Sequence, residues 1–558
     1  MLGSFGGLEV AKRALHAQQT ALYTTGHNIA NANTAGYTRQ RVNFNATTPF
    51  PPASRNRPQI PGQIGTGVEA GSIERIRDSF IDKQYRQENA KVGYYTSKAD
   101  IMSKMETILN EPSEAGLSHT MDQFWQALQD LSVNPEDSGA RSVVKERAIA
   151  LAESFQYVHS SLQDVRANLK NEIGVGETDV NSIIDQINQL NGQIAKIEPH
   201  GYVPNDLYDQ RDSLIDELSE YVDINVSYRE STGQPSPIAE GIVTITLNTE
   251  NTSVENNGSD PITLVNGSVD IIAGSDEAVN HVFVDFDNQN NVQAMFFAQP
   301  DRDLTSEEQI EALVANYDQE VFIYGENYEV QGKLNAIVDG AGYLQDFNYD
   351  GTGTNVPAGE YNEMLDELDV MVEHFVNEFN AVHKNGYSLV DSDGDGLGDQ
   401  GIDFFVGSTA DTIDVAEAIK NDTDLIAASS DGASGDGENA ISLADVYTKR
   451  VEQYITSNNT APDFVPTLDE KASIKSYFES IIGEMGVKAE ESIRMQGNSE
   501  ILRKQVVETR QSISTVSLDE EMTNLIQFQH AYNAAARNMT VVDEMLDRII
   551  NNMGLVGR

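Results

Sequence analysis

The stretch from Leu8 to Gln40 reads LEVAKRALHAQQTALYTTGHNIANANTAGYTRQ. Its large apolar residues recur every seven positions, at Leu8, Leu15, Leu22 and Ile29. This repeat is the spacing of a coiled-coil seam, and it predicts a helix with one apolar face. The seam is short and narrow for a helix that stands alone in water. The helix therefore needs a partner, and this need decides the fold.

A similar seam lies at the other end of the chain. Its residues are spaced alternately by four and three, at Leu518, Met522, Leu525, Gln529, Tyr532, Ala536 and Met539. Ser517 and Glu520 stand before it at the spacing of a capping box. Residues 1–50 are net basic, whereas residues 518–558 are net acidic. We therefore expect the two terminal helices to pack on each other or on other subunits.

The rest of the chain divides into helical outer zones and a central zone of strands. Helical periodicity marks residues 80–110, 117–132, 139–172, 177–198, 206–221, 361–384, 440–457 and 470–516. Period-two alternation with turn signals marks GIVTITLNTE, NHVFVDFDNQNNVQAMFF and EVFIYGENYEVQGKLNAIVDG. The expected fold class is α+β with several domains, in which the N- and C-terminal helices pair as a coiled coil or helical bundle around an inserted mainly-β domain.

The expected domain boundaries follow these zones. Residues 1–60 and 516–558 form the terminal domain, and residues 61–225 and 356–515 form a helical domain. Residues 226–355 form the inserted β domain, and residues 385–440 are a possible small subdomain within the second helical part.

The composition excludes several classes of function. The 558 residues include 88 Asp and Glu, 37 Lys and Arg and no cysteine, for a formal charge of -51. Such a charge disfavours binding to nucleic acid and to anionic membranes. Without cysteine there is no thiol nucleophile and no Cys-ligated metal. No apolar run reaches the roughly 18 residues of a membrane span, and the N-terminus lacks the apolar core of a cleaved signal peptide.

Most of the negative charge belongs to the middle of the chain. Residues 231–440 hold 41 Asp and Glu against Arg302, Lys333, Lys384 and Lys420, a net charge of -37. We interpret this region as a solvated outward surface. We therefore expect subunits to meet at the two chain ends, where positive and negative charges are nearly balanced.

Within this acidic region, one segment has the ligand spacing of a calcium loop. Oxygen ligands occur at Asp391, Asp393, Asp395, Asp399 and Asp403. Ile402 stands where a bidentate Glu is expected, so a solvated turn is the favoured interpretation and a Ca²⁺ site the alternative. No other cofactor is expected.

The sequence carries no pattern that is typical of an enzyme. It has neither a nucleophile elbow nor a phosphate-binding P-loop. His374 and His383 are nine residues apart on one expected helix, on roughly opposite faces. We therefore interpret them as packing or surface residues, and we expect no catalytic residue.

The segment Gly26–Gln40 closely resembles the rod-hook signature of bacterial flagellar axial proteins, N-N-I-A-N-x-N-T-P-G-Y-S-R-Q. Its matching residues are Asn28, Asn31, Asn33, Gly36, Tyr37, Arg39 and Gln40. The sequence departs from the signature at His27, Ala35 and Thr38, where Asn, Pro and Ser are usual. The segment Ser517–Arg537 resembles the C-terminal signature of the same family, and the length and the Gly-Tyr-Thr-Arg-Gln form are most similar to its hook-associated members.

This resemblance implies a structural adaptor between hook and filament, outside the cell in the bacterial flagellum. Many copies would form a ring, with the terminal helices as its inner, channel-lining layer. The implied partners are further copies of the chain, the hook protein, hook-associated protein 3 and a cytoplasmic export chaperone at the C-terminal helix. The resemblance also implies type III export without a cleaved signal peptide.

Two other functions stay open at this point. One is another axial component of the flagellum, such as a hook or rod protein. The other is a secreted acidic adhesin that depends on Ca²⁺, which would carry its activity in residues 226–440 and would not need the chain ends.

Overall fold

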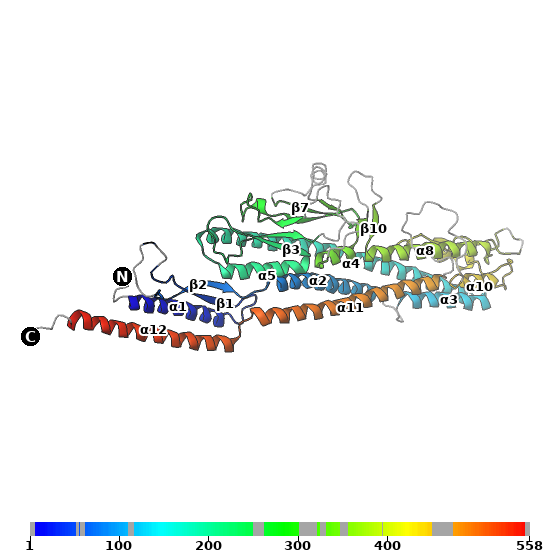
Figure 1. The fold of residues 1–558 in the computed structure, drawn as a ribbon. Coiled ribbons are helices and arrows are strands. Elements are labelled where there is room, and N and C mark those ends of the chain that lie inside the picture. Colours follow the sequence, from blue (N-terminus) through cyan, green and yellow to red (C-terminus); the bar gives the residue numbers. More distant parts are fainter. Residues whose placement is uncertain are drawn as a thin grey trace, which may run out of the picture.

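The structure is a computed structural model that describes residues 6–51, 55, 62–109, 116–248, 262–300, 321–323, 331–345, 355–392, 394, 396–448 and 473–552. The described chain is elongated, with a long helical body and a slimmer extension that contains both terminal helices (Figure 1).

Three long helices form the body. These are α2 (Ser79–Leu109), α4 (Ser138–Ile197) and α11 (Ile474–Ser514), and α11 runs along α2. The shorter helices α3 (Leu117–Val133), α5 (Asn205–Tyr221) and α8 (Glu360–Asn385) complete the bundle. Buried apolar residues recur along α4 at three- and four-residue steps, such as Leu151, Phe155, Val158 and Leu162, which keeps one face of this helix in the core.

The helix α4 is continuous where the sequence pattern predicted two helices, at 139–172 and 177–198. That expectation was wrong because Gly174 and Gly176 lie inside the helix. Gly176 packs against Leu334, and a Cβ atom there would be 3.3 Å from the leucine side chain. The glycine therefore permits a close approach of two elements and does not break the helix.

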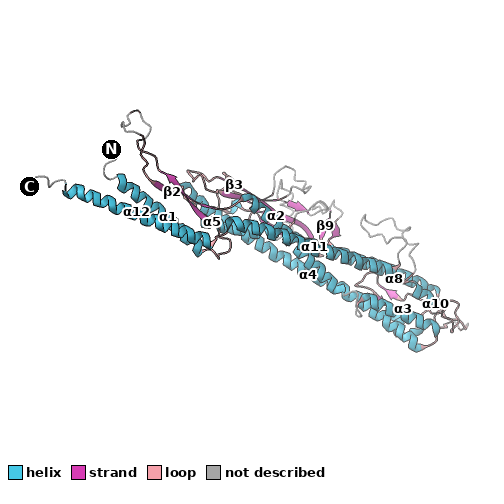
Figure 2. Cartoon of the chain, turned by 60° about the horizontal axis from the view of Figure 1, so that its bottom comes forward, coloured by secondary structure: helices cyan, strands magenta, loops and turns pink. Residues whose placement is uncertain are grey.

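The terminal extension pairs the two ends of the chain. Helix α1 (Gly6–Ala30) lies antiparallel along α12 (Leu518–Asn552), and the ribbon of β1 (Gln40–Ala46) and β2 (Val68–Arg75) covers α1 from another side (Figures 1 and 2). The expected fold class, with paired terminal helices and an inserted mainly-β region, is confirmed. The expected domain boundaries stay predictions.

The inserted region holds two sheets. The first has the order β3 (Ile224–Arg229), β4 (Ile242–Leu247) and β5 (Thr263–Val265). The second has the order β10 (Val356–Ala358), β9 (Tyr343–Gln345), β7 (Val292–Ala298) and β6 (His281–Phe286), with β8 (Val321–Ile323) also paired to β7. Neighbouring strands are antiparallel except β7 and β9, which are parallel.

Part of the predicted strand pattern is helical. Residues Lys333–Ala341 of EVFIYGENYEVQGKLNAIVDG form α7, so the expectation of a strand was wrong there. Leu334, Ala336, Ile337 and Val338 are all buried because α7 lies between α2, α4 and α8. When a segment is apolar on every side, its sequence shows no hydrophobic periodicity that could distinguish a helix from a strand.

Three asparagines of α4 attach the inserted region to the body. Asn181 donates to the carbonyl of Val282 at 2.8 Å and accepts from its amide at 2.7 Å. Asn191 bonds the backbone of Val243 in the same two ways, and Asn188 bonds the backbone of Gly274 and Ser275. These side-chain amides act as a neighbouring strand would, so the sheets are held by the helix itself.

The far end of the body is closed by short elements: β11 (Phe405–Val406), β12 (Asp414–Val415), α9 (Glu417–Asn421), the 3-10 turn Thr423–Leu425 and α10 (Glu438–Asp445). The helix expected at 440–457 thus ends early, and its residues from 449 on lie outside the described chain. The core here is aromatic, with Phe124, Trp125, Phe375, Phe379, Phe404 and Phe405 in mutual contact.

His383 lies beside this aromatic core and is fully buried. Its Nδ1 is 2.6 Å from the carbonyl of Ile402, and its Nε2 accepts from the amide of Ala427 at 2.9 Å. The imidazole must therefore be neutral with its proton on Nδ1. Burial lowers the pKa of His383 to about 4, from an ordinary value of 6.5.

We predict that His383 makes the far end sensitive to acid. The unfolded chain takes up a proton near pH 6.5 and the folded chain only near pH 4, so this stability is complete above pH 6.5 and is lost as the pH falls toward 4. At pH 4.5 the loss is on the order of 2–3 kcal/mol. Denaturant unfolding at pH 7.5 and 4.5 should show a larger loss for the wild type than for His383→Gln. Equal losses in the two proteins would contradict this role.

Candidate functional site

The rod-hook segment forms the joint where the terminal extension meets the body. Helix α1 ends at Ala30, and the chain turns through residues 31–36 before it enters β1. The buried side chain of Asn28 organises this turn. Its Nδ2 donates to the Gln40 carbonyl at 2.8 Å and to Glu521 at 3.1 Å, and its Oδ1 accepts from the Gln40 amide at 3.0 Å and the Tyr37 hydroxyl at 2.8 Å. All four hydrogen-bonding positions of the amide are filled.

Glu521 brings α12 into the same site. Its side chain is only 3% exposed. The carboxylate accepts a hydrogen bond from Asn28 and contacts Nε and Nη2 of Arg39, both at 2.9 Å. Arg39 also contacts Glu520 at 2.7 Å and donates its amide to the carbonyl of Ser514 at the end of α11. The two signature segments, nearly 500 residues apart in sequence, thus form one site.

The capping box expected at Ser517 and Glu520 is only half present. The Glu520 amide lies 3.5 Å from the Ser517 hydroxyl, which is a long contact. The Glu520 carboxylate pairs with Arg39, whose charge attracts it more strongly than the amide of Ser517 would. The expected capping box therefore lacks its second hydrogen bond, from the Ser517 amide to the Glu520 side chain, and that part of the prediction was wrong.

Tyr37 and Thr38 connect the turn to the body. The Thr38 amide donates to Asp209 of α5 at 3.1 Å, and the Tyr37 hydroxyl lies 2.9 Å from Nδ1 of His27. Burial, and then the carboxylates of Asp209, Asp206 and Glu521, raise the pKa of the Tyr37 phenol. Tyr37 therefore acts as a neutral hydrogen-bonding group at any ordinary pH.

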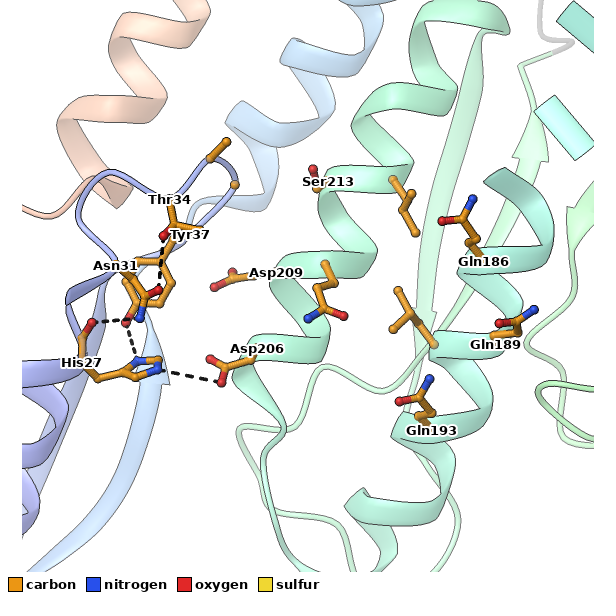
Figure 3. Close-up of a pocket in the computed structure, with 15 residues that line it drawn as sticks. His27, Asn31, Thr34, Tyr37, Gln186, Gln189, Gln193, Asp206, Asp209 and Ser213 are labelled. Atoms are coloured by element: carbon orange, nitrogen blue, oxygen red, sulfur yellow. Dashed lines mark hydrogen bonds and ion pairs between the residues drawn. The ribbon is translucent and has the colours of Figure 1, made fainter. Parts of the chain in front are cut away.

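A cavity of about 610 Å³ lies between this turn and the body (Figure 3). His27, Asn31, Thr34 and Tyr37 form one wall, whereas Asp206, Asp209 and Ser213 of α5 form another. The far side is a row of amides from α4, at Gln186, Gln189 and Gln193. Most of the lining side chains are polar, but Leu190 and Leu214 also line the cavity, so it can hold water or a chain segment of mixed polarity.

Behind the turn, a buried network of ions connects β2, α2, α5 and α11. Arg75 contacts Asp209 at 2.7 Å, Asp212 at 2.8 Å and also Glu240. Arg77 and Arg86 add contacts to Asp212, Asp82 and Asp216. Arg510 of α11 joins Asp82 at 3.0 Å and Asp216 at 2.7 Å. The body helices α2, α5 and α11 therefore all contribute charge to one cluster.

Asp212 is the centre of this network. Burial raises the pKa of its carboxyl group, but the guanidinium groups of Arg77, Arg75 and Arg86 outweigh burial and hold it well below its usual range. The group is thus ionised in the folded chain, and the stability that it supplies is lost only as the pH falls through the acid range.

This network was not predicted from the sequence. Its only local sign is the spacing of Asp209, Asp212 and Asp216, which places three carboxylates on one face of α5. The arginines come from distant parts of the chain, so no sequence pattern pairs them with α5.

The other residues of the predicted motif lie farther from the centre of the joint. Asn31 bonds only within the turn, to the His27 carbonyl and the Thr34 hydroxyl. Asn33 is exposed, and its side chain forms no hydrogen bond to any other residue that the structure describes. Gly36 adopts a positive φ of 77° next to Ser213, which favours glycine. Gln40 reaches Asp206 at 3.3 Å and Asn205 at 3.3 Å.

The predicted seams coincide only in part with the faces that the two terminal helices present to each other. In the described part of α12, Glu521, Ala535 and Leu546 are buried, and Glu521 contacts Asn28 of α1. At about 100° per residue, the seam residues Leu518, Met522, Gln529 and Ala536 lie roughly a quarter turn away, whereas Leu525, Tyr532 and Met539 point in nearly the same direction as Glu521. Leu518, Met522, Gln529 and Tyr532 are exposed, and Leu525, Ala536 and Met539 are half-buried.

The seam on α1 is displaced in the same way. Gly7, Ala21 and Asn28 face α12, whereas Leu8, Leu15, Leu22 and Ile29 lie beside that face and are half-buried. Because the helices are antiparallel, the two displacements turn both seams to the same side of the pair, opposite the β1–β2 ribbon. We call the residues of the two predicted seams together the apolar face.

The calcium candidate is only partly described. Asp393 and Asp395 lie outside the described residues. Asp391 accepts from the amides of Gly394 and Gly396, Asp399 accepts from Ser392, and Asp403 pairs with Lys384 at 2.6 Å. Within the described ranges, no group of three or more His, Asp or Glu side chains has the arrangement of a metal site.

We predict that Asn28→Asp loosens the joint. The change removes two donors and sets a carboxylate against the buried Glu521, which costs about 3 kcal/mol or more. Hydrogen exchange should show faster opening of α1 and α12, and Glu521→Gln in the same chain should restore part of the protection. Asn33→Asp is the matched control and should change stability by less than about 0.5 kcal/mol. Equal effects at Asn28 and Asn33 would argue against the site.

No helix in the described part of the chain has both the length and the apolar character needed to cross a membrane.

Comparisons with known proteins agree with this architecture. Residues 102–405 match the family model described as the flagellar hook-associated protein FlgK helical domain. Residues 8–38 match the model of the flagella basal body rod protein, and residues 509–553 match the flagellar basal body rod FlgEFG protein C-terminal model. The two rod models thus cover the two halves of the joint.

Two relatives that match almost the whole chain have the same name. Flagellar hook-associated protein 1 of Bacillus subtilis is 41% identical over 568 residues, with 100% of both chains covered. The protein of the same name in Salmonella typhimurium is 27% identical, with 97% of this chain and 98% of the relative covered. The flagellar hook junction protein FlgK from Burkholderia pseudomallei has a similar fold, with a TM-score of 0.53 at 12% identity over 77% of this chain and all of that one.

The rod-protein models match only the chain ends, whereas the full-length relatives and the model over residues 102–405 name the hook-associated protein, so a rod or hook protein and an adhesin are not favoured. The full-length relative at 41% identity and the match to the helical-domain model show the family of this chain, and its paired ends and continuous helical body are consistent with them. The chain belongs to the flagellar hook-associated protein 1 (FlgK) family.

Proposed function

We propose that this protein is a structural adaptor between the hook and the filament of the bacterial flagellum, where many copies form a ring through their terminal helix pairs. The observation that carries the proposal is the apolar face. Leu518 and Met522 are 49% and 51% exposed on a helix that is otherwise anchored by a buried ionic site. Exposed apolar side chains on an ordered helix pair indicate a protein interface.

The arrangement of the terminal pair suits contact between copies. The β1–β2 ribbon covers one side of α1, and α12 covers another, so the apolar face is the side left for a neighbour. The anchored joint keeps this face in a fixed orientation relative to the body. A ring needs such a fixed orientation, because each copy must present the same surface at the same angle.

The proposed work is mechanical and involves no reaction. In the joint, the polar groups of Asn28, Arg39 and Glu521 are occupied by one another. Such mutually satisfied groups hold a shape and have no hydrogen-bonding capacity left for a substrate.

The proposed partners are further copies of the chain, the hook protein on one side and hook-associated protein 3 on the other. The names of the relatives support an association with the hook, and the family resemblance of the chain ends implies the other partners. We also propose export through the flagellar type III apparatus without cleavage of a signal peptide, with a cytoplasmic chaperone on the C-terminal helix. The apolar side chains of α12 need such cover before assembly, and a chain without cysteine cannot form disulfides in transit.

We predict that Met522→Asp blocks assembly without unfolding the chain. Met522 belongs to the apolar face, so a carboxylate there places an unpaired charge between copies. Val143→Asp is the matched control, since Val143 is also 51% exposed but lies on α4 of the body. In a host that lacks its own copy, Met522→Asp should leave hooks without filaments, and Val143→Asp should restore filaments. Normal filaments with Met522→Asp would refute the proposed interface.

We further propose that the chain works without a metal or other cofactor. In the candidate calcium segment, the carboxylates of Asp391 and Asp399 cap backbone and hydroxyl groups, and Asp403 pairs with Lys384. Calorimetric titration with millimolar Ca²⁺ should give no binding heat and no shift of the melting temperature. Saturable heat that disappears in Asp391→Asn would establish a calcium site and overturn this proposal.

A further inference from the structure

Helix α12 carries two separate rows of exposed apolar side chains. The joint ridge consists of Leu518, Met522 and Ile526, and the distal ridge consists of Val541, Met545 and Ile549. The residues of each row follow one another at four-residue steps, and all these side chains are between 44% and 58% exposed. The joint ridge lies where α12 leaves the body, and the distal ridge lies toward the C-terminal end of the helix (Figure 1). Apolar rows of this kind on an ordered helix indicate surfaces for a partner.

The two ridges point in different directions. At about 100° and 1.5 Å per residue, Met545 lies about 140° around α12 from Met522 and about 35 Å farther along it. The joint ridge includes Leu518 and Met522 of the apolar face, so it points to the side opposite the β1–β2 ribbon. The distal ridge points to the side of the ribbon. One straight helix of a neighbouring molecule therefore cannot cover both ridges.

The ribbon covers this second side of α12 only near the joint. Gln527 points in the same direction as Met545, about five turns earlier on the helix. There Gln527 and Phe528 border a cavity of about 280 Å³ together with Val42 of β1. Farther along α12, the side chains that point the same way are exposed. The distal ridge thus lies beyond the part of α12 that the ribbon covers.

The charged side chains beside the two ridges have opposite signs. Asp519 is exposed at the start of the joint ridge, whereas Arg537 and Arg548 are exposed along the distal ridge. None of these three side chains forms an ion pair with a residue that the structure describes. The other two carboxylates of the first turn of α12 are already paired with Arg39. The ridges therefore offer unpaired charges that suit each other.

A ring of identical copies needs two different surfaces on each copy. Every copy has a neighbour on either side, and rotation about the ring axis brings one surface of a copy against another surface of the next. The two ridges meet this requirement, because they match in length and spacing, differ in direction and carry complementary charges. Contact between two copies of the same ridge would instead set like charges against each other, Asp519 against Asp519 or Arg548 against Arg548.

We propose that the joint ridge of each copy packs on the distal ridge of the next copy. This inference rests on the proposed function and names the second surface of its interface. Rotation about one axis keeps the α12 helices of neighbouring copies in the same direction, so the two ridges meet with Leu518 level with Val541. Asp519 and Arg537 point in the same direction on α12 and thus border the contact at the same edge. Neighbouring copies are offset by about 35 Å along α12, so the ring is one layer of a helix and not a flat circle.

Cysteine cross-linking in assembled flagella tests the proposal, because the chain has no cysteine of its own. Met522→Cys and Met545→Cys are placed in one chain and expressed in a host that lacks its own copy. Within one chain these positions are about 35 Å apart, so a disulfide between them can only join two copies. Oxidation of purified hooks with attached filaments should give a ladder of dimers, trimers and larger multimers, because each copy has one cysteine for either neighbour. Each single-cysteine variant should give nothing larger than a dimer.

A matched control and a second pair keep the test decisive. Asp543 is exposed close to Met545 along α12 but points to nearly the opposite side, so Met522→Cys with Asp543→Cys should give no ladder. Ile526→Cys with Ile549→Cys should repeat the ladder, and this pair serves if Met522→Cys does not assemble. Filaments without a ladder from the ridge pairs, or an equal ladder with Asp543→Cys, would overturn this contact and leave the proposed function intact. Normal filaments in a host without this protein would instead refute the proposed function itself.

Discussion

The structure depends on one buried carboxylate, that of Glu521, which is held by Asn28 and Arg39. An ionised carboxylate is costly to bury unless a cation and hydrogen-bond donors surround it. Here the donors come from the first 40 residues and the acceptor from the last 40. If either end of the chain is absent, the buried polar groups of the other end therefore lose their hydrogen-bond and ion-pair partners. The apolar face exists as a surface only when both ends are in place, because each helix supplies half of it.

The body supplies a rigid support for this joint. The continuous helix α4 extends from the far end to the cavity beside His27, and polar residues along its length bind other elements. Arg141 donates to the carbonyls of Pro135 and Ile426 at the far end, and Arg166 donates to that of Ala341 in the middle. The three asparagines attach the sheets. Since each of these groups bonds the backbone, neighbouring side chains can vary without loss of the attachment.

Much of this architecture could be predicted from the sequence, but not the details of the joint. Periodicity identified the terminal helices, because their apolar residues repeat at regular spacing. It could not tell which face each helix buries: the repeat of Leu8, Leu15 and Leu22 marks an apolar face, whereas the contact with α12 uses small residues such as Ala21. The network around Asp212 was missed because its arginines and carboxylates lie in four separate segments. The predictions of a break in α4 at its glycines and of a strand at α7 were wrong, because tertiary packing outweighed the local sequence preference at both places.

The central claim is that the two chain ends of one copy recognise each other through Glu521 and thereby present the apolar face to neighbouring copies. An electron cryomicroscopy map of the assembled hook-filament junction tests this most directly. The account predicts that Glu521 lies against Asn28 and Arg39 of its own chain, with Leu15 and Met522 buried between copies. A map in which Glu521 is inserted into the joint of another copy, or in which Leu15 and Met522 face open solvent, would contradict it.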